Sequence, residues 1–508
     1  MSLIKSLQNP SLYDHAVDKI KVIETHISWV LLTGEFVYKI KKPVDFGFLD
    51  FSTLKKRQFY CEEELRLNRR LAPELYLEVV AISGSERYPQ LNGTGTVFEY
   101  AVKMRQFPQS SQLDRLLVKD KLNNSIMDGL ARKVAQFHLV IPAADKETRY
   151  GDLEHIQQPV LENFSHIRSC IADETTTSAL DKLEQWTHQQ LHKLSQIIQL
   201  RKEQGYVREC HGDMHLRNIA LWQDEIVIFD CIEFNENFYW IDVMSDIAFL
   251  VMDLEARQQE IMAQRFLNAY LEITGDYEGL ALFLFYKVYR AMVRAKVAAL
   301  RLSQEQAGSK EYTQAIKEFQ QYINLAERYT KSKPVTLLIN YGLSGSGKSV
   351  AAQLLAEKLP AIRIRSDVER KRLFRSGLEK LYTTEATLKT YTRLSNISKA
   401  LLSSGYSVII DAANLKLQQR KYFIDLAKSM HIRYYVLAYQ AEEAILKQRI
   451  EARAQRGDDA SDATVEILIK QLETHEPLST EEQPFAIKID TSRNMDIGAI
   501  IRQITPPS

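Results

Sequence analysis

The feature that most constrains the fold is a glycine-rich loop between an apolar run and a stretch that favours a helix. The loop reads Gly342-Leu-Ser-Gly-Ser-Gly-Lys-Ser349, fits G-x-x-x-x-G-K-[ST] at every fixed position, and follows the apolar run 335–340. In that setting, backbone N–H groups of the loop and of the helix N-terminus cradle phosphate oxygens. Lys348 is expected to contact the β- and γ-phosphates, and the Ser349 hydroxyl to bind Mg²⁺. The candidate nucleotide-binding residues are Gly342, Ser344, Gly345, Ser346, Gly347, Lys348 and Ser349.

Strand-like and helix-like patterns alternate from residue 335 to the end of the chain. The strand-like runs are 335–340, 361–365, 407–410, 434–439 and 485–489. Repeated alternation of this kind predicts an α/β domain with a parallel sheet that is covered on both faces. The pattern changes within residues 325–335, so we expect one domain over residues 1–330 and a P-loop domain over residues 331–508.

Two carboxylates follow strands of this predicted sheet. Asp367 comes after the second strand and Asp411 ends the third. Ligands of open α/β sheets bind at the carboxyl ends of the strands, so both acids are expected to face the nucleotide. Asp367 is the better candidate for a general base, and Asp411 suits a water-mediated contact with Mg²⁺. The alternative for each residue is an aspartate that caps a helix N-terminus.

A later polar helix carries a row of arginines. Arg449, Arg453 and Arg456 are separated by four and three residues, so they share one helix face, and the polar loop 457–462 follows them. Arg449 and Arg453 are therefore candidates for stabilising the charge on a transferring phosphoryl group. The alternative is a solvated basic face.

The first 330 residues contain a second phosphate-related motif. His211-Gly-Asp213-Met-His-Leu-Arg-Asn218 has the form H-x-D-x-x-x-x-N of a kinase catalytic loop, and the run 226–229 ends at Asp230. A short hairpin is expected to bring Asn218 and Asp230 together at one Mg²⁺ ion. Asp213 is the candidate that orients or deprotonates an acceptor hydroxyl.

A lysine and a carboxylate partner are needed to complete such a site. Lys39 lies on the second predicted strand, and Lys41 points to the same face, so either can contact the α- and β-phosphates. Glu64, on the following helix, is the expected partner of that lysine, with Glu62 and Glu63 as neighbours.

The order of patterns in this half predicts an α+β domain with two lobes. A hairpin is expected over residues 24–41, a charged helix over 54–71, and further strands over 76–82 and 97–106. Helices are expected from there to residue 330, interrupted by a β-rich segment at 206–234.

These residues resemble the aminoglycoside phosphotransferase family, a branch of the protein-kinase-like fold, over approximately residues 20–330. Leu130-Ala-Arg-Lys-Val-Ala-Gln-Phe-His138 resembles the helix ahead of the catalytic loop, and Asp242-Val-Met-Ser-Asp246 resembles the helix that carries a structural aspartate. Cys231 departs from the family pattern, as does the single glycine, Gly34, of the hairpin that would cover the nucleotide.

The P-loop half resembles the small P-loop kinases, which include gluconate kinase, zeta toxins and 5′-polynucleotide kinases. Asp367-Val-Glu-Arg370 is similar to the D-x-x-R element, in which the resemblance implies that Asp367 activates a hydroxyl and Arg370 holds an acceptor phosphate. Residues 351–400 carry eleven Lys/Arg and five Asp/Glu, as suits a phosphorylated or polynucleotide acceptor. The fusion resembles bacterial bifunctional proteins with an aminoglycoside-phosphotransferase-like and an ATP-binding half.

Bulk properties favour a cytoplasmic protein that does not enter a membrane. The N-terminus lacks the apolar core of a signal peptide, no apolar stretch approaches the length of a membrane span, and the four cysteines show no paired spacing. We expect a bifunctional phosphotransferase that uses ATP (or GTP) and Mg²⁺. Its acceptors would be a small molecule for the first half and a phosphorylated metabolite or nucleic-acid end for the second. The alternative is one active kinase joined to a nucleotide-dependent switch or to a non-catalytic binding module.

Overall fold

The chain forms two compact units, and each is described by itself. The computed structural model describes residues 2–47, 49–171, 173–374, 383–456, 464–493 and 495–505. Unit 1 consists of Met1–Leu180, Thr187–Asp253 and Tyr289–Ile316, and unit 2 consists of Asp181–Trp186, Leu254–Val288 and Lys317–Ser508. Unit 2 therefore combines the P-loop region with segments that precede residue 331.

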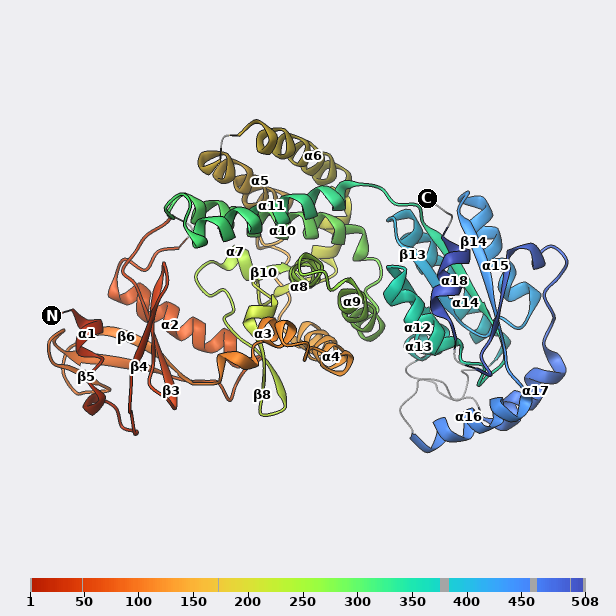
Figure 1. The fold of residues 1–508 in the computed structure, drawn as a ribbon, viewed down its shortest axis with the longest axis horizontal. Coiled ribbons are helices and arrows are strands. Elements are labelled where there is room, and N and C mark those ends of the chain that lie inside the picture. The colour runs from red at the N-terminus through yellow and green to blue at the C-terminus, as the bar shows by residue number, and fades with distance from the viewer. Residues whose placement is uncertain are drawn as a thin grey trace. The chain divides into compact units, whose positions relative to one another are not determined.

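Unit 1 begins with a six-stranded antiparallel sheet in the order β1-β2-β3-β6-β4-β5 (Figure 1). Its strands are β1 (Lys21–Glu24), β2 (Ser28–Leu32), β3 (Phe36–Lys41), β4 (Tyr76–Gly84), β5 (Pro89–Leu91) and β6 (Val97–Arg105). Helix α2 (Leu54–Arg69) packs against β4 and β6, and its N-cap Thr53 accepts a hydrogen bond from the backbone of Lys56. The sheet and α2 place the lysines of β3 beside Glu64.

The predicted hairpin differs from the structure at its first strand. β2 and β3 pair as expected, with Ser28 opposite Lys41, but the run from residue 24 to 32 is broken after β1. The backbone N–H and the hydroxyl of Thr25 both donate to the carbonyl of Ser28. This local bonding makes a tight turn that competes with a continuous strand, and alternation of apolar residues does not reveal it.

The rest of the chain up to residue 330 is mainly helical. Its helices are α3 (Leu113–Val118), α4 (Asn124–Val140), α5 (Leu153–Cys170), α6 (Glu174–Glu203), α7 (Glu236–Tyr239), α8 (Val243–Ala256), α9 (Glu260–Thr274), α10 (Leu280–Leu302) and α11 (Lys310–Thr330). The predicted β-rich segment consists of β7 (Val207–Glu209), which pairs with β10 (Trp240–Asp242), and the hairpin of β8 (Ile219–Trp222) and β9 (Glu225–Ile228). The H-x-D-x-x-x-x-N loop runs between β7 and β8.

Unit 2 contains the predicted parallel sheet, with five strands in the order β12-β13-β11-β14-β15. The strands are β11 (Thr336–Tyr341), β12 (Ala361–Arg365), β13 (Ser407–Asp411), β14 (Arg433–Gln440) and β15 (Ala486–Asp490). The helices that follow them are α12 (Lys348–Lys358), α13 (Ser366–Leu373), α14 (Thr384–Ser403), α15 (Leu417–Ser429), α16 (Glu443–Arg456), α17 (Val465–Thr474) and α18 (Ile497–Ile504). The loop after the central strand β11 lies at the switch point of the strand order, where ligands of such sheets bind.

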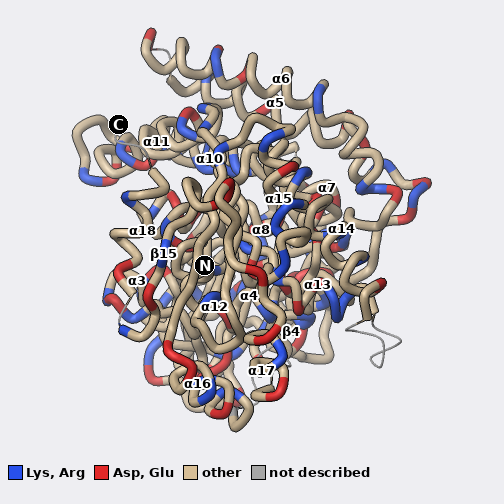
Figure 2. The backbone as a smooth tube through the Cα atoms, turned by 90° about the vertical axis from the view of Figure 1, so that its right-hand side faces the viewer, with Lys and Arg blue, Asp and Glu red and all other residues tan. Residues whose placement is uncertain are grey.

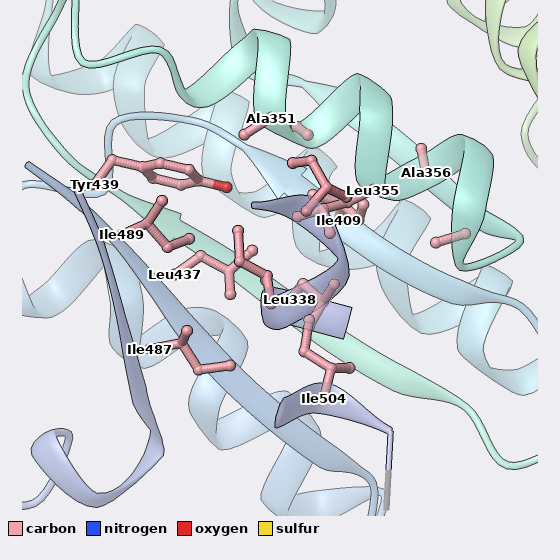
Figure 3. Close-up of a cluster of buried hydrophobic side chains, with 14 residues drawn as sticks. Leu338, Ala351, Leu355, Ala356, Ile409, Leu437, Tyr439, Ile487, Ile489 and Ile504 are labelled. Atoms are coloured by element: carbon pink, nitrogen blue, oxygen red, sulfur yellow. The ribbon is translucent and has the colours of Figure 1, made fainter. Parts of the chain in front are cut away.

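Apolar side chains cover both faces of this sheet. On one face, Leu338 of β11 and Leu437 of β14 share a buried cluster with Leu355 of α12 and Ile504 of α18 (Figure 3). Alternate strand residues point to opposite faces, and Ile339, the next residue of β11, is also fully buried. Burial of each such side chain contributes about 1.5–3 kcal/mol, so the core fixes the strand ends that carry the site.

Candidate functional site

The conformation of the P-loop in unit 2 depends on its glycines and on contacts with helices α16 and α17. Gly345 and Gly347 have φ angles of +79° and +78°, and a Cβ atom on Gly345 would lie 2.5 Å from the carbonyl oxygen of Leu446 in α16. The loop therefore requires glycine at residue 345 for both conformation and space. The N–H of Ser344 donates to Oε1 of Gln471 at 2.8 Å, a contact between residues 127 positions apart that no sequence pattern predicts.

Lys348 lies over this loop. Its Nζ donates to the carbonyl of Leu343 at 2.7 Å and to the hydroxyl of Ser346 at 3.4 Å. Burial lowers the pKa of Lys348 to about 8, although the charges of Asp411 and Asp367 oppose this shift. A bound phosphate would restore the favourable environment for the ammonium group.

Asp411 and Ser349 form a possible Mg²⁺ site. The Ser349 hydroxyl donates to Oδ1 of Asp411 at 3.1 Å. The other carboxylate oxygen, Oδ2, is buried and has no hydrogen-bond partner among the residues that the structure describes. Hydroxyl and carboxylate oxygens are the ligands that Mg²⁺ prefers, and a buried oxygen without a hydrogen bond suits a metal or its water. The residues present therefore fit the expected ion.

Asp367 faces the same cavity as Asp411. It is the second residue of α13, whose N-cap is Arg365, so Asp367 is not the N-cap residue of this helix. Asp411 ends β13 and is not an N-cap either, since the next helix, α15, has its N-cap at Lys416. Burial and then the nearby charge of Asp411 raise the pKa of Asp367, which increases its basicity.

The predicted arginines occupy different parts of this region. Arg449 donates to the carbonyl of Thr491 at 2.6 Å and to that of Gly345 at 3.4 Å, so it braces the P-loop. Arg453 and the buried Arg370 line the cavity, and Arg370 donates to the hydroxyl of Thr387 at 3.4 Å. The side chain of Arg456 and the loop 457–462 lie outside the described residues, as do residues 375–382 of the basic segment.

The cavity itself has a volume of about 880 Å³ and is rich in cations. Eight lysines and arginines line it, against two carboxylates, Asp367 and Asp411. Arg365, Lys416, Lys470 and Arg493 belong to this set and were missed from the sequence; only Arg365, at the end of a strand, had a positional signal. Figure 2 shows that lysines and arginines elsewhere are interspersed with acidic residues along the chain.

In unit 1, the two candidate lysines of β3 have different contacts. The Nζ atom of Lys39 lies 2.8 Å from Oε1 of Glu64 and 2.8 Å from Oδ1 of Asp230. Burial disfavours the charged form of Lys39, but Asp230 and Glu64 outweigh it and hold the pKa of Lys39 well above its usual value. Lys41 is fully buried between Glu64, at 2.7 Å, and Glu233. Lys39 is thus the lysine next to the candidate metal ligand.

The neighbours of Glu64 face other partners. Glu62 accepts a hydrogen bond from Gln58, and Glu63 pairs with Arg66 on the same helix. Burial opposes ionisation of Glu64, but Lys39 and Lys41 prevail and lower its pKa. Among the three candidates, Glu64 is the one in contact with the lysines of β3.

The catalytic-loop motif brings Asp213 and Asn218 together. The Asn218 amide donates to the Asp213 carboxylate at 3.0 Å, which leaves the amide oxygen as a possible metal ligand. The β8–β9 hairpin forms as predicted, and the N–H of Phe229 donates to the carbonyl of Asn218 at 2.9 Å. Asp230 follows directly, with a half-exposed side chain and a φ of +62° that is unusual outside glycine. The side-chain oxygens of Asn218 and Asp230 are therefore of a kind that could hold Mg²⁺.

Helix α8 holds this loop in place through Asp246. Its carboxylate accepts hydrogen bonds from the N–H groups of His211, at 3.1 Å, and Gly212, at 2.9 Å, and contacts the His138 ring at 3.1 Å. Burial opposes ionisation of Asp246, but these partners lower its pKa to about 2. The buried Asp246 carboxylate thus holds the backbone of His211 and Gly212, directly ahead of Asp213.

Comparisons with known proteins match two separate segments of the chain. Residues 53–283 match the family model described as the phosphotransferase enzyme family, and residues 337–478 match that of an AAA domain. Uncharacterized proteins of Mycobacterium tuberculosis and Mycobacterium bovis are 28% identical over 457 residues, which is 88% of this chain and 88% of each relative.

Solved structures are similar to one half or the other. An amicoumacin kinase in complex with AMP-PNP, Ca²⁺ and Ami is 13% identical and covers 63% of this chain and 92% of its own, with a TM-score of 0.40. A gluconokinase from Sinorhizobium meliloti 1021 is 22% identical and covers 34% of this chain and 90% of its own, with a TM-score of 0.26.

The chain is a kinase-class enzyme. A segment that matches the phosphotransferase enzyme family is followed by one that matches the AAA-domain model and carries the P-loop and the parallel sheet, in agreement with the resemblances noted in the sequence. Within the described residues, no helix is long and apolar enough to cross a membrane.

Proposed function

We propose that this chain is a bifunctional ATP-dependent phosphotransferase, in which each of two sites moves a γ-phosphoryl group to an acceptor hydroxyl. The observation that carries the proposal is that each unit gathers a lysine, carboxylates and further side-chain oxygens, which are the groups that phosphate binding, proton removal and Mg²⁺ require. These groups are Lys39, Asp213, Asn218 and Asp230 in unit 1, and Lys348, Asp367, Ser349 and Asp411 in unit 2.

In the P-loop site, the chemistry follows from the charges around the loop. Lys348 and the loop N–H groups bind the β- and γ-phosphates, while Ser349 and Asp411 would hold Mg²⁺, which neutralises phosphate charge when bound. The oxygen of the acceptor hydroxyl bonds to the γ-phosphorus, and the bond between the γ-phosphorus and the nucleoside diphosphate breaks. Asp367 accepts the proton that the hydroxyl loses. The raised pKa of Asp367 makes it a stronger base than an exposed aspartate.

In unit 1, the same transfer uses a different scaffold. Lys39, oriented by Glu64, contacts the phosphates, and Asn218 and Asp230 would hold Mg²⁺. Asp213 accepts the hydroxyl proton of the acceptor while the Asn218 amide keeps its carboxylate in place. The lysine comes from β3, the base and Asn218 come from the catalytic loop, and Asp230 follows β9.

For the P-loop site we propose an acceptor that already carries a phosphate group. The excess of cations in the 880 Å³ cavity supports this class, with Arg370 as the residue that holds the acceptor phosphate. A nucleic-acid end is the second candidate. Among the described residues that line the cavity, Tyr391 is the one aromatic side chain, which offers little surface for stacked bases. A phosphorylated small molecule is therefore favoured.

For unit 1 we propose a small-molecule acceptor. A cavity of about 610 Å³ lies beside Glu233, three residues after Asp230, and its volume is in the range of small-molecule sites. Tyr60, Tyr150 and Glu236 also line it. Asp213 does not line this cavity, so the size of the cavity supports the acceptor class and not its binding pose.

The proposed donor is ATP with Mg²⁺, and GTP is the second candidate because the residues named above contact phosphates and not the base. The proposed compartment is the cytoplasm. The four cysteines, Cys61, Cys170, Cys210 and Cys231, are all free thiols, which supports a reducing environment.

The test is nucleotide consumption and product labelling by the intact chain with Mg²⁺. Lys348→Ala, Asp213→Ala and the double variant are compared in a metabolite extract and with RNA that carries 5′-hydroxyl ends. Two labelled products, each lost with one variant, are expected. Matched controls are the exposed residues in Lys399→Ala and Asp425→Ala, which should change neither product.

Other outcomes assign the chain to the alternative functions. If Asp213→Ala changes no product while Lys348→Ala removes all turnover, unit 1 is a non-catalytic binding module. If Asp367→Ala leaves every product intact but Lys348→Ala alters the rate at the Asp213 site, the P-loop acts as a nucleotide-dependent switch.

A further inference from the structure

Helix α9 contributes a polar face to the P-loop site. The helix lies in the segment matched by the phosphotransferase family, but it belongs to unit 2, where it packs against α12 and β12. Arg265, Asn268 and Glu272 are three and four residues apart, so they share one face of α9. Arg265 Nη1 lies 2.8 Å from Oε1 of Glu357, and this ion pair joins α9 to α12.

Asn268 completes the hydrogen bonds of β12. This strand is at the edge of the parallel sheet, so one side of its backbone lacks a neighbouring strand. The Asn268 side chain accepts from the N–H of Arg363 at 2.8 Å and donates to the carbonyl of Ala361 at 3.1 Å. The side chain takes the place of a neighbouring strand at these two groups, and α9 thereby fixes the first three residues of β12, the strand that leads to Asp367.

Glu272 then binds two arginines of that strand. Its Oε2 lies 2.8 Å from Arg363 Nη2, and its Oε1 lies 2.9 Å from Arg365 Nη1. The second terminal nitrogen of Arg363, Nη1, donates to the carbonyl of Ser349 at 3.2 Å. The Nε atom of Arg365 lies 3.9 Å from Oδ2 of Asp411. Each arginine held by Glu272 therefore reaches one of the two residues that fit Mg²⁺.

We propose that Glu272 is a positioning residue of the P-loop site, which keeps Arg365 from pairing closely with Asp411. The proposal rests on the proposed function of that site. At 3.9 Å, Arg365 is beyond hydrogen-bond distance, and Oδ2 of Asp411 has no hydrogen-bond partner among the described residues. Without Glu272, the Arg365 guanidinium forms a charge-assisted hydrogen bond with that oxygen and competes with Mg²⁺ for it.

The experiment measures how much Mg²⁺ the full-length chain needs to bind a non-hydrolysable ATP analogue at the P-loop. It is done in a Lys39→Met background, so that binding at unit 1 does not contribute. Glu272→Ala should raise the half-saturating Mg²⁺ concentration by about tenfold, the size typical of coupling between charged neighbours. Glu272→Gln, which retains a hydrogen bond to one arginine, should raise it less. Glu278→Ala, at an exposed glutamate after α9, should leave it unchanged.

The double variant Glu272→Ala/Arg365→Met separates positioning from simple structural support. Its Mg²⁺ requirement should return to within twofold of that of Arg365→Met alone, because the competing guanidinium is gone. An unchanged requirement in Glu272→Ala, or an equal rise in the single and double variants, would overturn the proposal. Failure of the proposed function is distinguishable: Lys348→Ala would then not weaken analogue binding, whatever residue stands at 272.

Discussion

Lys39 and Lys41 lie on the same face of β3 but meet different charges. Lys39 contacts Asp230 and Glu64, and a small part of its side chain remains accessible. Lys41 is fully buried and neutralises Glu64 and Glu233 together. Periodicity assigns both to one face and cannot separate them, since the difference depends on Glu233, which is 192 residues away along the chain.

The two lysines should therefore respond differently to removal of charge. Lys41→Met should destabilise unit 1 by about 3–5 kcal/mol in urea unfolding, because two buried carboxylates lose their cation. Lys39→Met should instead weaken nucleotide binding at unit 1 with a much smaller loss of stability. Lys41→Met/Glu233→Gln serves as the control and should recover part of the stability. Equal losses of stability in the two single variants would contradict this assignment.

The raised pKa of Asp367 should appear as a pH-dependent cost to folding. Burial, followed by the charge of Asp411, favours the protonated form in the folded state, so the folded chain binds more protons than the unfolded chain. Stability then falls as the pH rises from the ordinary carboxyl pKa through the raised one. Asp367→Asn should be more stable than the parent chain at pH 7, and this gain should vanish as the pH falls to about 4.

Thermal unfolding of the parent chain and of Asp367→Asn across this pH range checks that prediction. The same variant should lose phosphoryl transfer at the P-loop site and retain nucleotide binding, because the carboxylate is proposed as the base and not as a phosphate ligand. A difference in midpoint that does not change with pH would contradict the assigned origin of the cost.

Among the elements, the P-loop depends on how closely α16 approaches it. Gly345 and Gly405 have nearly equal φ angles, +79° and +84°, but only Gly345 is crowded, with Leu446 O at 2.5 Å from a built Cβ atom. Apart from its two chain neighbours, no described residue has an atom within 4 Å of a Cβ on Gly405. Substitution of Gly405 therefore tests the strain of a left-handed backbone alone, whereas substitution of Gly345 adds a collision with α16.

Gly345→Ala should therefore abolish nucleotide binding at the P-loop, because the loop or α16 must move. Gly405→Ala should cost about 1 kcal/mol of stability and leave binding intact. Titration of each variant with the ATP analogue, in the Lys39→Met background, makes the comparison. If Gly405→Ala weakens binding as much as Gly345→Ala, the left-handed conformation and not the contact with Leu446 sets the requirement.

Elements defined by local pattern could be predicted, while contacts between distant residues could not. The P-loop, the parallel sheet, the β8–β9 hairpin and the placing of Glu64 beside the lysines of β3 follow from periodicity, motif spacing and turn residues, although the choice between Lys39 and Lys41 does not. The break after β1 depends on a side chain, Thr25, that bonds its own turn. The contacts of Glu272 with Arg363 and Arg365 span more than 90 residues and carry no local signal.

At the scale of the whole molecule, the compact units are not consecutive halves. Unit 2 includes Leu254–Val288, which lies before the expected boundary at residue 330, and α9 in that segment reaches the P-loop sheet. A fragment that begins at residue 331 would lack Asn268 and Glu272. The full chain is therefore the suitable material for measuring either site.

Because a phosphate-binding lysine is proposed for each unit, the intact chain should bind two molecules of a Mg²⁺-bound ATP analogue. Calorimetric titration should give a stoichiometry of two for the parent chain and for the exposed control Lys399→Ala. It should give one for Lys348→Ala, one for Lys39→Met and none for the double variant. A stoichiometry of one in the parent chain, abolished by Lys348→Ala and unaffected by Lys39→Met, would mean that unit 1 keeps its lysine network for structure. The charges of Lys39, Glu64 and Asp230 would then balance one another without a nucleotide, and the enzyme would have a single donor site.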